Sequence, residues 1–303
     1  MVGEGDAFAT VAGRPCVVMS TGMGGTKDSG LMPFAEAFAG AGLDVLLFDY
    51  RGFGESGGRE RQVAWPPDHR RDLAEAVRFA RGLEGIDPGR IVLWGWSWGS
   101  SHAIYQAVAD PEPVAAVIAV GPEVDGFATL RHLVAQIGLS SLASLNARAA
   151  RDLVAKARGL PPELIPLVGP PGTLAALTTE ESEPGYTTIA GPTWRNEVAA
   201  RVATAELGNR AISRADRIRC PILIQAGDRD SIAPIETARR LAWEAKGHSE
   251  LREYPGGHWD YLLELRPRVI EDELHFLRRH LARKPGDAGT ASPPGASAAA
   301  APS

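Results

Sequence analysis

The chain contains the run Ile91-Val92-Leu93-Trp94-Gly95-Trp96-Ser97-Trp98-Gly99-Ser100-Ser101. It starts as a buried strand, passes through Gly-x-Ser-x-Gly, and ends in small residues typical of a helix start. The two glycines stand where the strand and helix backbones come too close for a Cβ atom. We therefore expect Gly95 and Gly99 to flank a sharp, strained turn that places the hydroxyl of Ser97 at the carboxyl end of a sheet.

The pentapeptide by itself also arises by chance in glycine-rich chains, and this chain holds 34 glycines among 303 residues. Its position between a hydrophobic strand and a helix is the context that the nucleophile-elbow motif requires. That context favours a reactive serine at Ser97.

Length and composition bound the class of protein. The chain is long enough for one large α/β domain, or for one domain that carries an insertion. A net charge of -5 gives no electrostatic case for binding nucleic acid or an anionic membrane. The N-terminus lacks the form of a signal peptide, and no apolar run approaches the roughly eighteen residues of a membrane span. We expect a soluble, cytoplasmic protein.

The sequence shows no sign of a metal or cofactor. Cys16 and Cys220 each lie at or near the start of an apolar run, and we expect both to be buried structural thiols. The loop at 51–54, Arg-Gly-Phe-Gly, lacks the Lys-Ser/Thr pair that follows in a phosphate-binding loop. We interpret it as a tight turn, and no dinucleotide-binding motif is visible.

Strands and helices alternate through the first part of the chain. Strands are expected at 15–20, 43–48, 91–96 and 114–120, and helices at 31–41, 68–83 and 100–109. Continuous apolar strands of this kind are typical of a sheet buried on both faces. The alternation predicts an α/β fold with a doubly wound, mostly parallel sheet.

The alternation stops over residues 122–217, where no clear strand is visible. A helical stretch at 127–158 is followed by a proline cluster at 161–171 and then by polar turns. We interpret residues 122–217 as a mostly helical cap that lies over the carboxyl edge of the sheet.

The core resumes after the cap. Strands are expected at 221–226 and 250–254, and helices at 235–246 and 266–283. The predicted organisation is therefore a core made of residues 1–121 and 218–284, interrupted by the cap. Residues 285–303 are rich in Ala, Pro, Gly and Ser, and we expect a disordered tail there.

A serine nucleophile needs a base to accept its proton. The candidates are His69, His102, His132, His248, His258, His275 and His280. Only His258 directly follows a predicted strand, in a loop whose two glycines allow the imidazole to reach the nucleophile. It is the expected base. We expect the four histidines on other helices to be solvated or to act as caps, and His102 to point into the packing of the elbow helix.

The base in turn needs an acid to orient it, and three residues are candidates. Asp230 ends the loop after the penultimate strand, just before the proline that starts a helix, and is the expected acid. Asp228 in the same loop is more typical of a turn former that bonds its own backbone. Asp125, which follows an earlier strand, is the third candidate.

Acyl transfer also needs hydrogen-bond donors for a developing oxyanion. The N–H of Trp98, which follows the nucleophile, is one expected donor. The loop at 21–25, Thr-Gly-Met-Gly-Gly, follows the first strand and faces the elbow, and we expect the N–H of Met23 to be the second. Trp96 or Trp98 is expected either to line the acyl pocket, as a substrate-binding residue, or to pack in the core.

As an ordered set, these motifs resemble those of serine hydrolases with the α/β-hydrolase fold. The chain is similar to bacterial esterase-like and dienelactone-hydrolase-like proteins, with Phe-Asp-Tyr-Arg-Gly-Phe-Gly-Glu-Ser at 48–56 and Pro-Gly-Gly-His-Trp-Asp at 255–260. Some relatives tailor polyketides. The resemblance covers roughly residues 14–283. It implies a Ser97–Asp230–His258 triad with Met23 and Trp98 as oxyanion donors.

Two features depart from this family. Relatives usually have His-Gly in the oxyanion loop where this chain has Thr21-Gly22. A backbone donor survives that change, although loop support and substrate contacts differ. Relatives also begin with an antiparallel hairpin, for which too few residues precede Pro15. We expect a shortened sheet edge and, as a hypothesis, a homodimer that covers it, because exposed edges are a liability.

Three functions follow as hypotheses. The first is a cofactor-independent serine hydrolase that cleaves an ester, thioester or lactone through an acyl-enzyme on Ser97. The second is an acyltransferase, cyclase or lyase that tailors a polyketide-like small molecule while the cap excludes water. The third is a non-catalytic binding protein, which the three matching triad residues disfavour. A serine nucleophile argues against the dehalogenases and epoxide hydrolases of this fold, which attack with an aspartate.

Overall fold

The computed structural model of the chain describes residues 7–282. Six strands form its central sheet, in the order β2-β1-β3-β4-β7-β8, and every neighbouring pair is parallel. The strands are β1 (Arg14–Ser20), β2 (Asp44–Leu47), β3 (Ile86–Trp96), β4 (Ala116–Val120), β7 (Ile222–Gly227) and β8 (Ser249–Tyr254). The predicted parallel α/β sheet is confirmed. The tail predicted at 285–303 lies outside the described residues.

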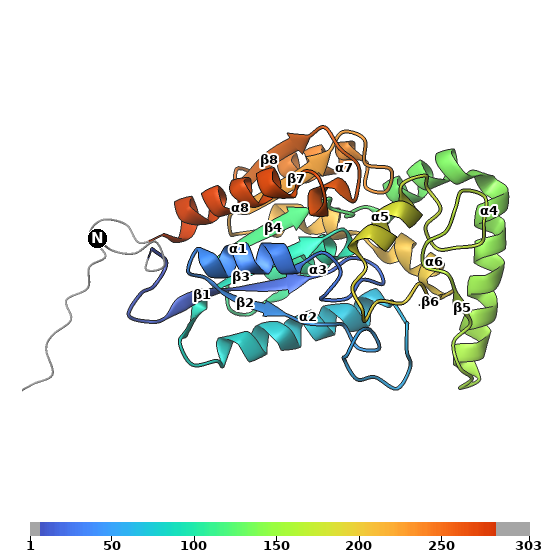
Figure 1. Cartoon of the computed structure of the whole chain (residues 1–303), viewed down its shortest axis with the longest axis horizontal. Helices are drawn as coiled ribbons and strands as arrows, with labels where there is room; N and C mark the ends of the chain where they lie inside the picture. The colour runs from blue at the N-terminus through green and yellow to red at the C-terminus, as the bar shows by residue number, and fades with distance from the viewer. Residues whose placement is uncertain (1–6, 283–303) are drawn as a thin grey trace, which may run out of the picture.

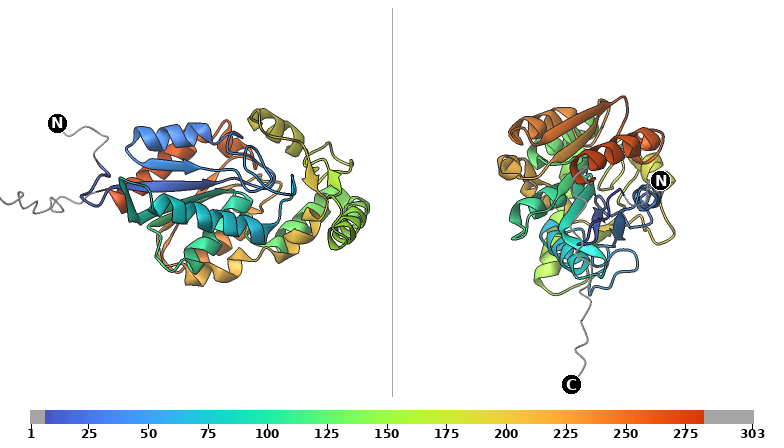
Figure 2. Two further views of the ribbon diagram at one scale, coloured as in Figure 1. Left: turned by 90° about the horizontal axis from the view of Figure 1, so that it is seen from below. Right: turned by 90° about the vertical axis from the view of Figure 1, so that its left-hand side faces the viewer.

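Helices cover both faces of this sheet, because side chains along β3 alternate between two hydrophobic clusters (Figure 2). Val92 and Trp94 pack in one cluster, and Ile91 and Leu93 pack in the other. The first cluster includes side chains of α1 (Met32–Gly40) and α8 (Arg266–Leu281), and the second those of α2 (Pro66–Arg81), α3 (Trp98–Ala109) and α7 (Ile235–Glu244). The sheet is therefore doubly wound, as predicted.

Most of the chain between β4 and β7 lies beyond the carboxyl ends of the strands (Figure 1). It contains α4 (Gly126–Ala157), β5 (Leu164–Ile165), α5 (Ser182–Ile189), β6 (Val198–Ala199), α6 (Val202–Ala205), η2 (Glu206–Gly208) and η3 (Ala211–Arg217). We call residues 122–209 the cap, because η3 packs with α3 and α7 in the core. Helix α4 bends at Gly138, where φ is 81° and ψ is 162°.

Two sequence expectations for this segment were wrong. No strand was expected, yet β5 and β6 pair antiparallel. Each is two residues long, too short for an alternating pattern to show. Polar turns were expected where α5 forms, because its sequence, Ser-Glu-Pro-Gly-Tyr-Thr-Thr-Ile, contains proline and glycine and has weak helix propensity.

Strand β2 is one edge of the sheet, with half-buried side chains. Among the described residues nothing pairs with its outer side, and residues 10 and 13 form only an isolated bridge. The expected short edge is thus present. The homodimer that would cover it stays a prediction, which light scattering at micromolar protein concentration would test.

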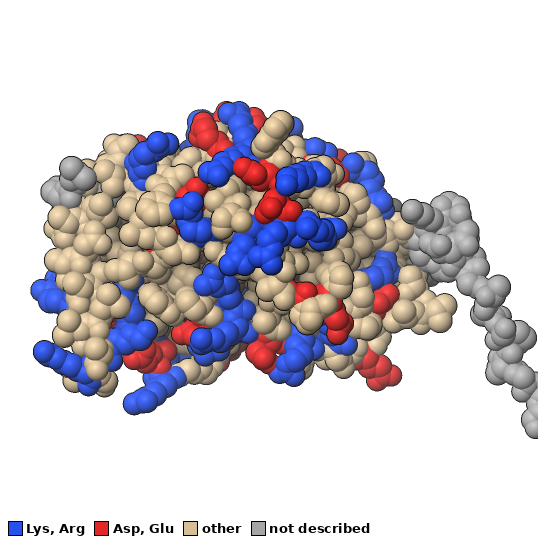
Figure 3. Space-filling model, turned by 180° about the vertical axis from the view of Figure 1, so that it is seen from behind, with Lys and Arg blue, Asp and Glu red and all other residues tan. Residues whose placement is uncertain are grey.

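The burial of both cysteines agrees with the sequence interpretation. Figure 3 shows basic and acidic side chains on one face of the molecule. Cys16 and Cys220 are buried free thiols, and burial raises their pKa values to about 12 and about 11. Within residues 7–282, no helix combines the length and apolar character needed to cross a membrane.

Candidate active site

Ser97 occupies the turn between β3 and α3 in a strained conformation. Its φ is 56° and its ψ is -121°, a region that costs a residue with a side chain roughly 1–3 kcal/mol. Its N–H donates to the carbonyl oxygen of Val120 at 2.9 Å. A Cβ atom at Gly95 would lie 2.2 Å from the carbonyl carbon of Gly99, and one at Gly99 would lie 2.4 Å from the carbonyl oxygen of Ser20. Both glycines are required, as the sequence predicted.

His258 and Asp230 form a buried hydrogen-bonded pair. The Nδ1 atom of His258 lies 2.8 Å from Oδ2 and 3.0 Å from Oδ1 of Asp230. The N–H groups of Ile232 and Ala233 donate to Oδ1 at 2.9 and 2.7 Å, and the hydroxyl of Tyr261 donates to Oδ2 at 3.2 Å. These three donors fix the carboxylate, which in turn orients the imidazole.

The electrostatics of the pair favour a protonated imidazole. Burial by itself would lower the pKa of His258, but the charge of Asp230 and its hydrogen bond outweigh burial and raise that pKa above its usual value. The ring of Trp96 lies 5.3 Å from the imidazole, and its Nε1–H donates to the carbonyl oxygen of His258 at 3.2 Å. Trp96 therefore both lines the cavity described below and supports the histidine.

Among the described residues, Asp230 is the acid that hydrogen-bonds to the imidazole of His258. Asp228 lies in the same loop with its side chain 55% exposed. Asp125 caps α4 by accepting the N–H of Phe127 at 3.2 Å, and it faces two arginines at 3.6 and 3.7 Å. The geometry thus selects one of the three acids.

The other histidines lie apart from this pair. His102 is buried in helix packing, as expected, and His275 and His280 are exposed on α8. The solvated or capping role expected for His69 is wrong. Its ring is buried and stacks on Tyr50 with ring centroids 4.0 Å apart, and burial lowers its pKa to about 4.

Met23 and Trp98, the residues expected to supply the two oxyanion donors, both line the same cavity. Met23 lies in the loop after β1, and Trp98 is the first residue of α3, whose opening N–H groups have no partner within the helix. A Cβ atom on Gly22 would lie 3.0 Å from the Cβ of Ser97, so the loop approaches the elbow closely. This places the backbone of residues 21–25 beside the serine.

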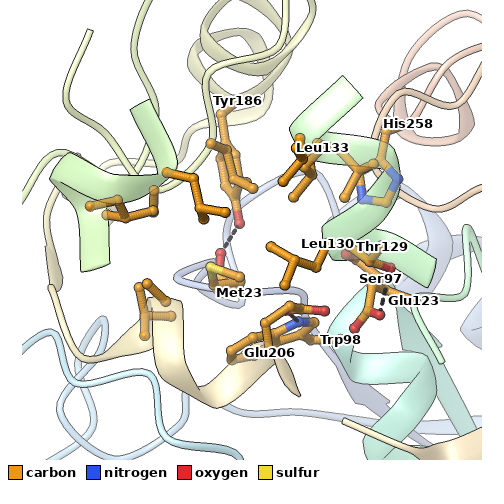
Figure 4. A pocket seen from close by; sticks show the side chains of 18 of the residues that line it. Met23, Ser97, Trp98, Glu123, Thr129, Leu130, Leu133, Tyr186, Glu206 and His258 are labelled. Carbon is orange, nitrogen blue, oxygen red and sulfur yellow. Dashed lines mark hydrogen bonds between the residues drawn. The ribbon is translucent and has the colours of Figure 1, made fainter. Parts of the chain in front are cut away.

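A cavity of about 60 Å³ joins these groups. Ser97 and His258 line it from the core, and Leu130, Leu133 and Tyr186 line it from the cap (Figure 4). Most of the lining is apolar. The cap therefore encloses the reactive groups in a small hydrophobic space.

Cap residues that the sequence analysis missed hold the core loops in place. The carboxylate of Glu181 accepts the N–H of Ser231 at 2.8 Å and that of His258 at 2.9 Å. The hydroxyl of Tyr186 donates to the carbonyl oxygen of Met23 at 2.5 Å. These partners lie far apart in sequence and follow no motif, so no local signal could have revealed them.

Two buried acids in the cavity were missed as well. Glu123 follows β4, and Glu206 begins η2. Trp98 donates its Nε1–H to Glu206 at 2.9 Å, and the hydroxyl of Thr129 donates to Glu123 at 2.8 Å. Burial raises the pKa of both acids. Within residues 7–282, no three His, Cys, Asp or Glu side chains are grouped to hold a metal ion.

Comparison with known proteins identifies the family. Residues 15–265 match the family described as alpha/beta hydrolase fold. The chain belongs to this family and is an enzyme of the α/β-hydrolase class. The resemblance suggested by the sequence motifs is confirmed.

Several relatives match over most of their length. The quorum-quenching protein AidA of Acinetobacter baumannii is 35% identical, over 89% of this chain and 88% of its own. The thiohydrolase aneE of Aspergillus aculeatus is 28% identical over 89% of both chains. The polyketide transferase grgF of a Penicillium species is 25% identical over 88% of this chain and 89% of its own. A crystal structure of GrgF superposes with a TM-score of 0.75 at 24% identity, covering 90% and 92% of the two chains.

Proposed function

We propose that this enzyme is a serine hydrolase that cleaves an ester, thioester or lactone through an acyl-enzyme on Ser97. One observation carries the proposal. The strained Ser97 and His258, whose imidazole is hydrogen-bonded to Asp230, line the same cavity. A nucleophile, a base and an orienting acid are the parts that acyl transfer by a serine needs.

Each group has a distinct role in this mechanism. The Oγ atom of Ser97 attacks the carbonyl carbon while Nε2 of His258 accepts its proton, and Asp230 holds the Nδ1–H of the imidazole. The N–H groups of Met23 and Trp98 stabilise the oxyanion. His258 then protonates the leaving group, and a water molecule, activated by the same histidine, releases the acid.

The cavity supports an acyl substrate with an apolar portion. Its lining includes Leu130, Leu133 and Leu145, and it contains no lysine or arginine that would pair with a phosphate. The names of the relatives include a thiohydrolase, consistent with a thioester. The cavity volume is about 60 Å³, and a movement of the cap would make room for a larger substrate.

A second function is favoured by burial of the site. Ser97 is 6% exposed and His258 is 2% exposed, so bulk water has little access to an acyl-enzyme. An alcohol, amine or carbon nucleophile that enters the cavity would then compete with water for the acyl group. The alternative to hydrolysis that we propose is therefore acyl transfer or cyclisation of a polyketide-like substrate.

Covalent labelling tests both functions. A fluorophosphonate should add once to the wild-type enzyme and not to Ser97→Ala, as measured by intact mass. The control is Ser213→Ala, which changes an exposed serine in η3 and should label like wild type. Labelling of Ser97→Ala, or none of the folded wild-type protein, would refute an activated serine at this position.

A substrate panel then separates hydrolysis from transfer. Acyl thioesters and p-nitrophenyl esters are supplied with and without an alcohol acceptor, and the products are resolved by mass spectrometry. Free acid as the dominant product in both cases supports the hydrolase. Ester formation that exceeds hydrolysis supports the transferase.

A further inference from the structure

One carboxylate of the cap bridges the two core loops that carry Asp230 and His258. Glu181 immediately precedes α5, and its Oε1 atom accepts the N–H of Ser231, the residue after Asp230, at 2.8 Å. Its Oε2 atom accepts the N–H of His258 at 2.9 Å. The loops of the acid and of the base therefore share one anchor, and that anchor is a side chain from outside the core.

Other contacts fix the turn that carries Glu181. The hydroxyl of Ser231 donates to that of Thr179 at 2.8 Å, and the hydroxyl of Ser182 accepts the N–H of Thr179 at 3.2 Å. Thr179 and Ser182 are both buried. The turn at 179–182 is therefore bonded to the loop of Asp230 beside the carboxylate, which limits how far Glu181 can move.

The loop of the base makes room for this carboxylate at Gly257. A Cβ atom there would overlap with Oε2 of Glu181 and would lie 3.0 Å from its Cδ atom. The backbone of Gly257 does not adopt a positive φ, so its conformation suits residues with a side chain. A methyl group at this position would thus displace the carboxylate from the N–H of His258 without straining the loop itself.

The charge of Glu181 acts on the imidazole as well. Burial by itself would lower the pKa of His258, but the charge and the hydrogen bond of Asp230 raise it above its usual value. The charges of Glu181 and Glu123 act in the same direction. Asp230 acts from the loop after β7, Glu123 from the loop after β4 and Glu181 from the cap. The cap therefore supplies part of the field that favours the imidazolium.

The remaining titratable groups nearby add little opposing charge. Burial raises the pKa values of Tyr186, Tyr261 and Glu206, so all three stay neutral near neutral pH. Asp260 is a further carboxylate on the loop of the base and accepts a backbone N–H of that loop at 2.8 Å. The side chain of Arg229 is 71% exposed, and solvent screens its charge.

We propose that Glu181 is a positioning residue that fixes the loops of Asp230 and His258 relative to each other and adds its charge to that of Asp230 at the imidazole. Glu181 does not line the cavity, and its carboxylate bonds to backbone groups, so it acts through His258 and not on the substrate. The reactivity of Ser97 then depends on a docked cap. This inference rests on the proposed function, in which the acid and the base activate Ser97.

Covalent labelling measures the reactivity of Ser97 without a known substrate. The limiting rate constant for labelling by a fluorophosphonate, kinact, is followed by intact mass for wild type, Glu181→Gln, Glu181→Ala and Glu180→Gln. Glu180→Gln is the matched control. Glu180 is exposed on the same surface groove as Glu181, and within the described part of the chain it forms no hydrogen bond to either core loop.

We expect Glu181→Ala to lower kinact about 10- to 100-fold, because both loops lose their anchor and small misplacements of reacting groups are costly. Glu181→Gln should lower it about 3- to 10-fold, since its single amide oxygen can hold only one of the two loops. Glu180→Gln should label like wild type. Unchanged or faster labelling of folded Glu181→Ala overturns the proposal, because the residue would then affect access alone.

Gly257→Ala perturbs the same contact from the core side. Its methyl group should displace Glu181 and lower kinact much as Glu181→Ala does. The double variant should lose no more than Glu181→Ala alone, because both changes remove one interaction. Losses that multiply in the double variant overturn the proposal, since the two residues would then act independently.

The protonation of His258 gives a readout that a purely structural role would not move. Proton NMR follows the ring N–H that bonds to Asp230 as the pH is varied. His258 should titrate at lower pH in Glu181→Gln than in wild type, because a negative charge that favours the imidazolium is gone. Glu180→Gln should titrate like wild type. Identical titrations of Glu181→Gln and wild type overturn the proposal.

The titration needs no reaction at Ser97, so it separates this inference from the proposed function. A folded wild type that does not label refutes the serine hydrolase, while the titration of Glu181→Gln still decides the role of Glu181. A wild type that labels, with no change in either readout for the Glu181 variants, refutes the positioning role alone.

Discussion

Tyr186 of the cap donates its hydroxyl to the carbonyl oxygen of Met23 in the loop at 21–25, with an O···O distance of 2.5 Å. The tyrosine is buried, and its ring stacks on Trp194 with centroids 5.4 Å apart. This bond fixes the peptide carbonyl of a residue whose N–H is the proposed oxyanion donor. The cap is thereby linked to the loop that carries one donor of the proposed oxyanion hole.

Removal of that hydroxyl should slow catalysis more than it weakens binding. Tyr186→Phe keeps the aromatic ring but loses the bond to Met23, and we expect kcat to fall about 3- to 10-fold with KM nearly unchanged. Steady-state kinetics on a p-nitrophenyl ester measure both constants. The control is Tyr105→Phe, which removes a hydroxyl that accepts the N–H of Arg210 at 3.1 Å and should leave kcat unaltered. A rise in KM alone would show that Tyr186 acts on substrate entry instead.

The two aspartates of one loop should respond differently. Asp230→Asn leaves the geometry in place but favours the wrong tautomer of His258, and a loss of roughly 10⁴-fold in kcat is expected from serine enzymes with this arrangement. Asp228→Asn should change kcat less than about twofold, because its carboxylate faces solvent. Comparable losses in both variants would contradict the assignment of the acid.

Activity should disappear on the acid side of a raised histidine pKa. His258 accepts a proton only when neutral, so kcat/KM should fall about tenfold per pH unit below its pKa, which lies above the ordinary 6.5. The residual activity of Asp230→Asn should show this limb at lower pH, because the charge that raises the pKa is gone. Profiles of kcat/KM between about pH 5 and pH 9 locate the acid limb of wild type and that of Asp230→Asn. If the two acid limbs coincide, Asp230 does not raise the pKa of His258.

A buried ion pair should hold the cap together. Asp152 of α4 and Arg201 after β6 are both fully buried. The Nε and Nη2 atoms of Arg201 donate to Oδ2 and Oδ1 of Asp152 at 2.7 Å and 3.0 Å. Asp152→Ala leaves the buried guanidinium without its close partner and with only the carboxylate of Glu60 at 3.7 Å, and a loss of about 3 kcal/mol in unfolding free energy is expected. Urea denaturation measures it. Asp44→Ala, which breaks an exposed pair with Arg14, should cost less than about 1 kcal/mol.

Local sequence was sufficient to predict the core. The inner strands β3, β4 and β7 contain continuous apolar runs, at 91–94, 116–120 and 222–224, because both of their faces are covered by helices, and such runs are visible without neighbours. The turn at Ser97 was equally visible, since two glycines are needed where backbones approach within 2.2–2.4 Å of a would-be Cβ. His258 and Asp230 were predictable because each follows a strand at the same edge of the sheet.

The structure of the cap could not be predicted from local sequence. Its short strands and the helix α5 carry little periodicity, and they are stabilised by contacts with distant residues. The burial of His69 against Tyr50 was missed for a similar reason, because helical spacing alone does not say how deep a polar side chain packs.

The sequence by itself thus determined the parallel sheet, the strained serine and the order of the three proposed catalytic residues, because these depend on backbone geometry that local residue types dictate. Only the tertiary structure decided which aspartate meets His258, how Glu181 and Tyr186 fix the core loops, and that Glu123 and Glu206 share one cavity. Those relationships join residues from different elements, and they arise only when the cap packs onto the sheet.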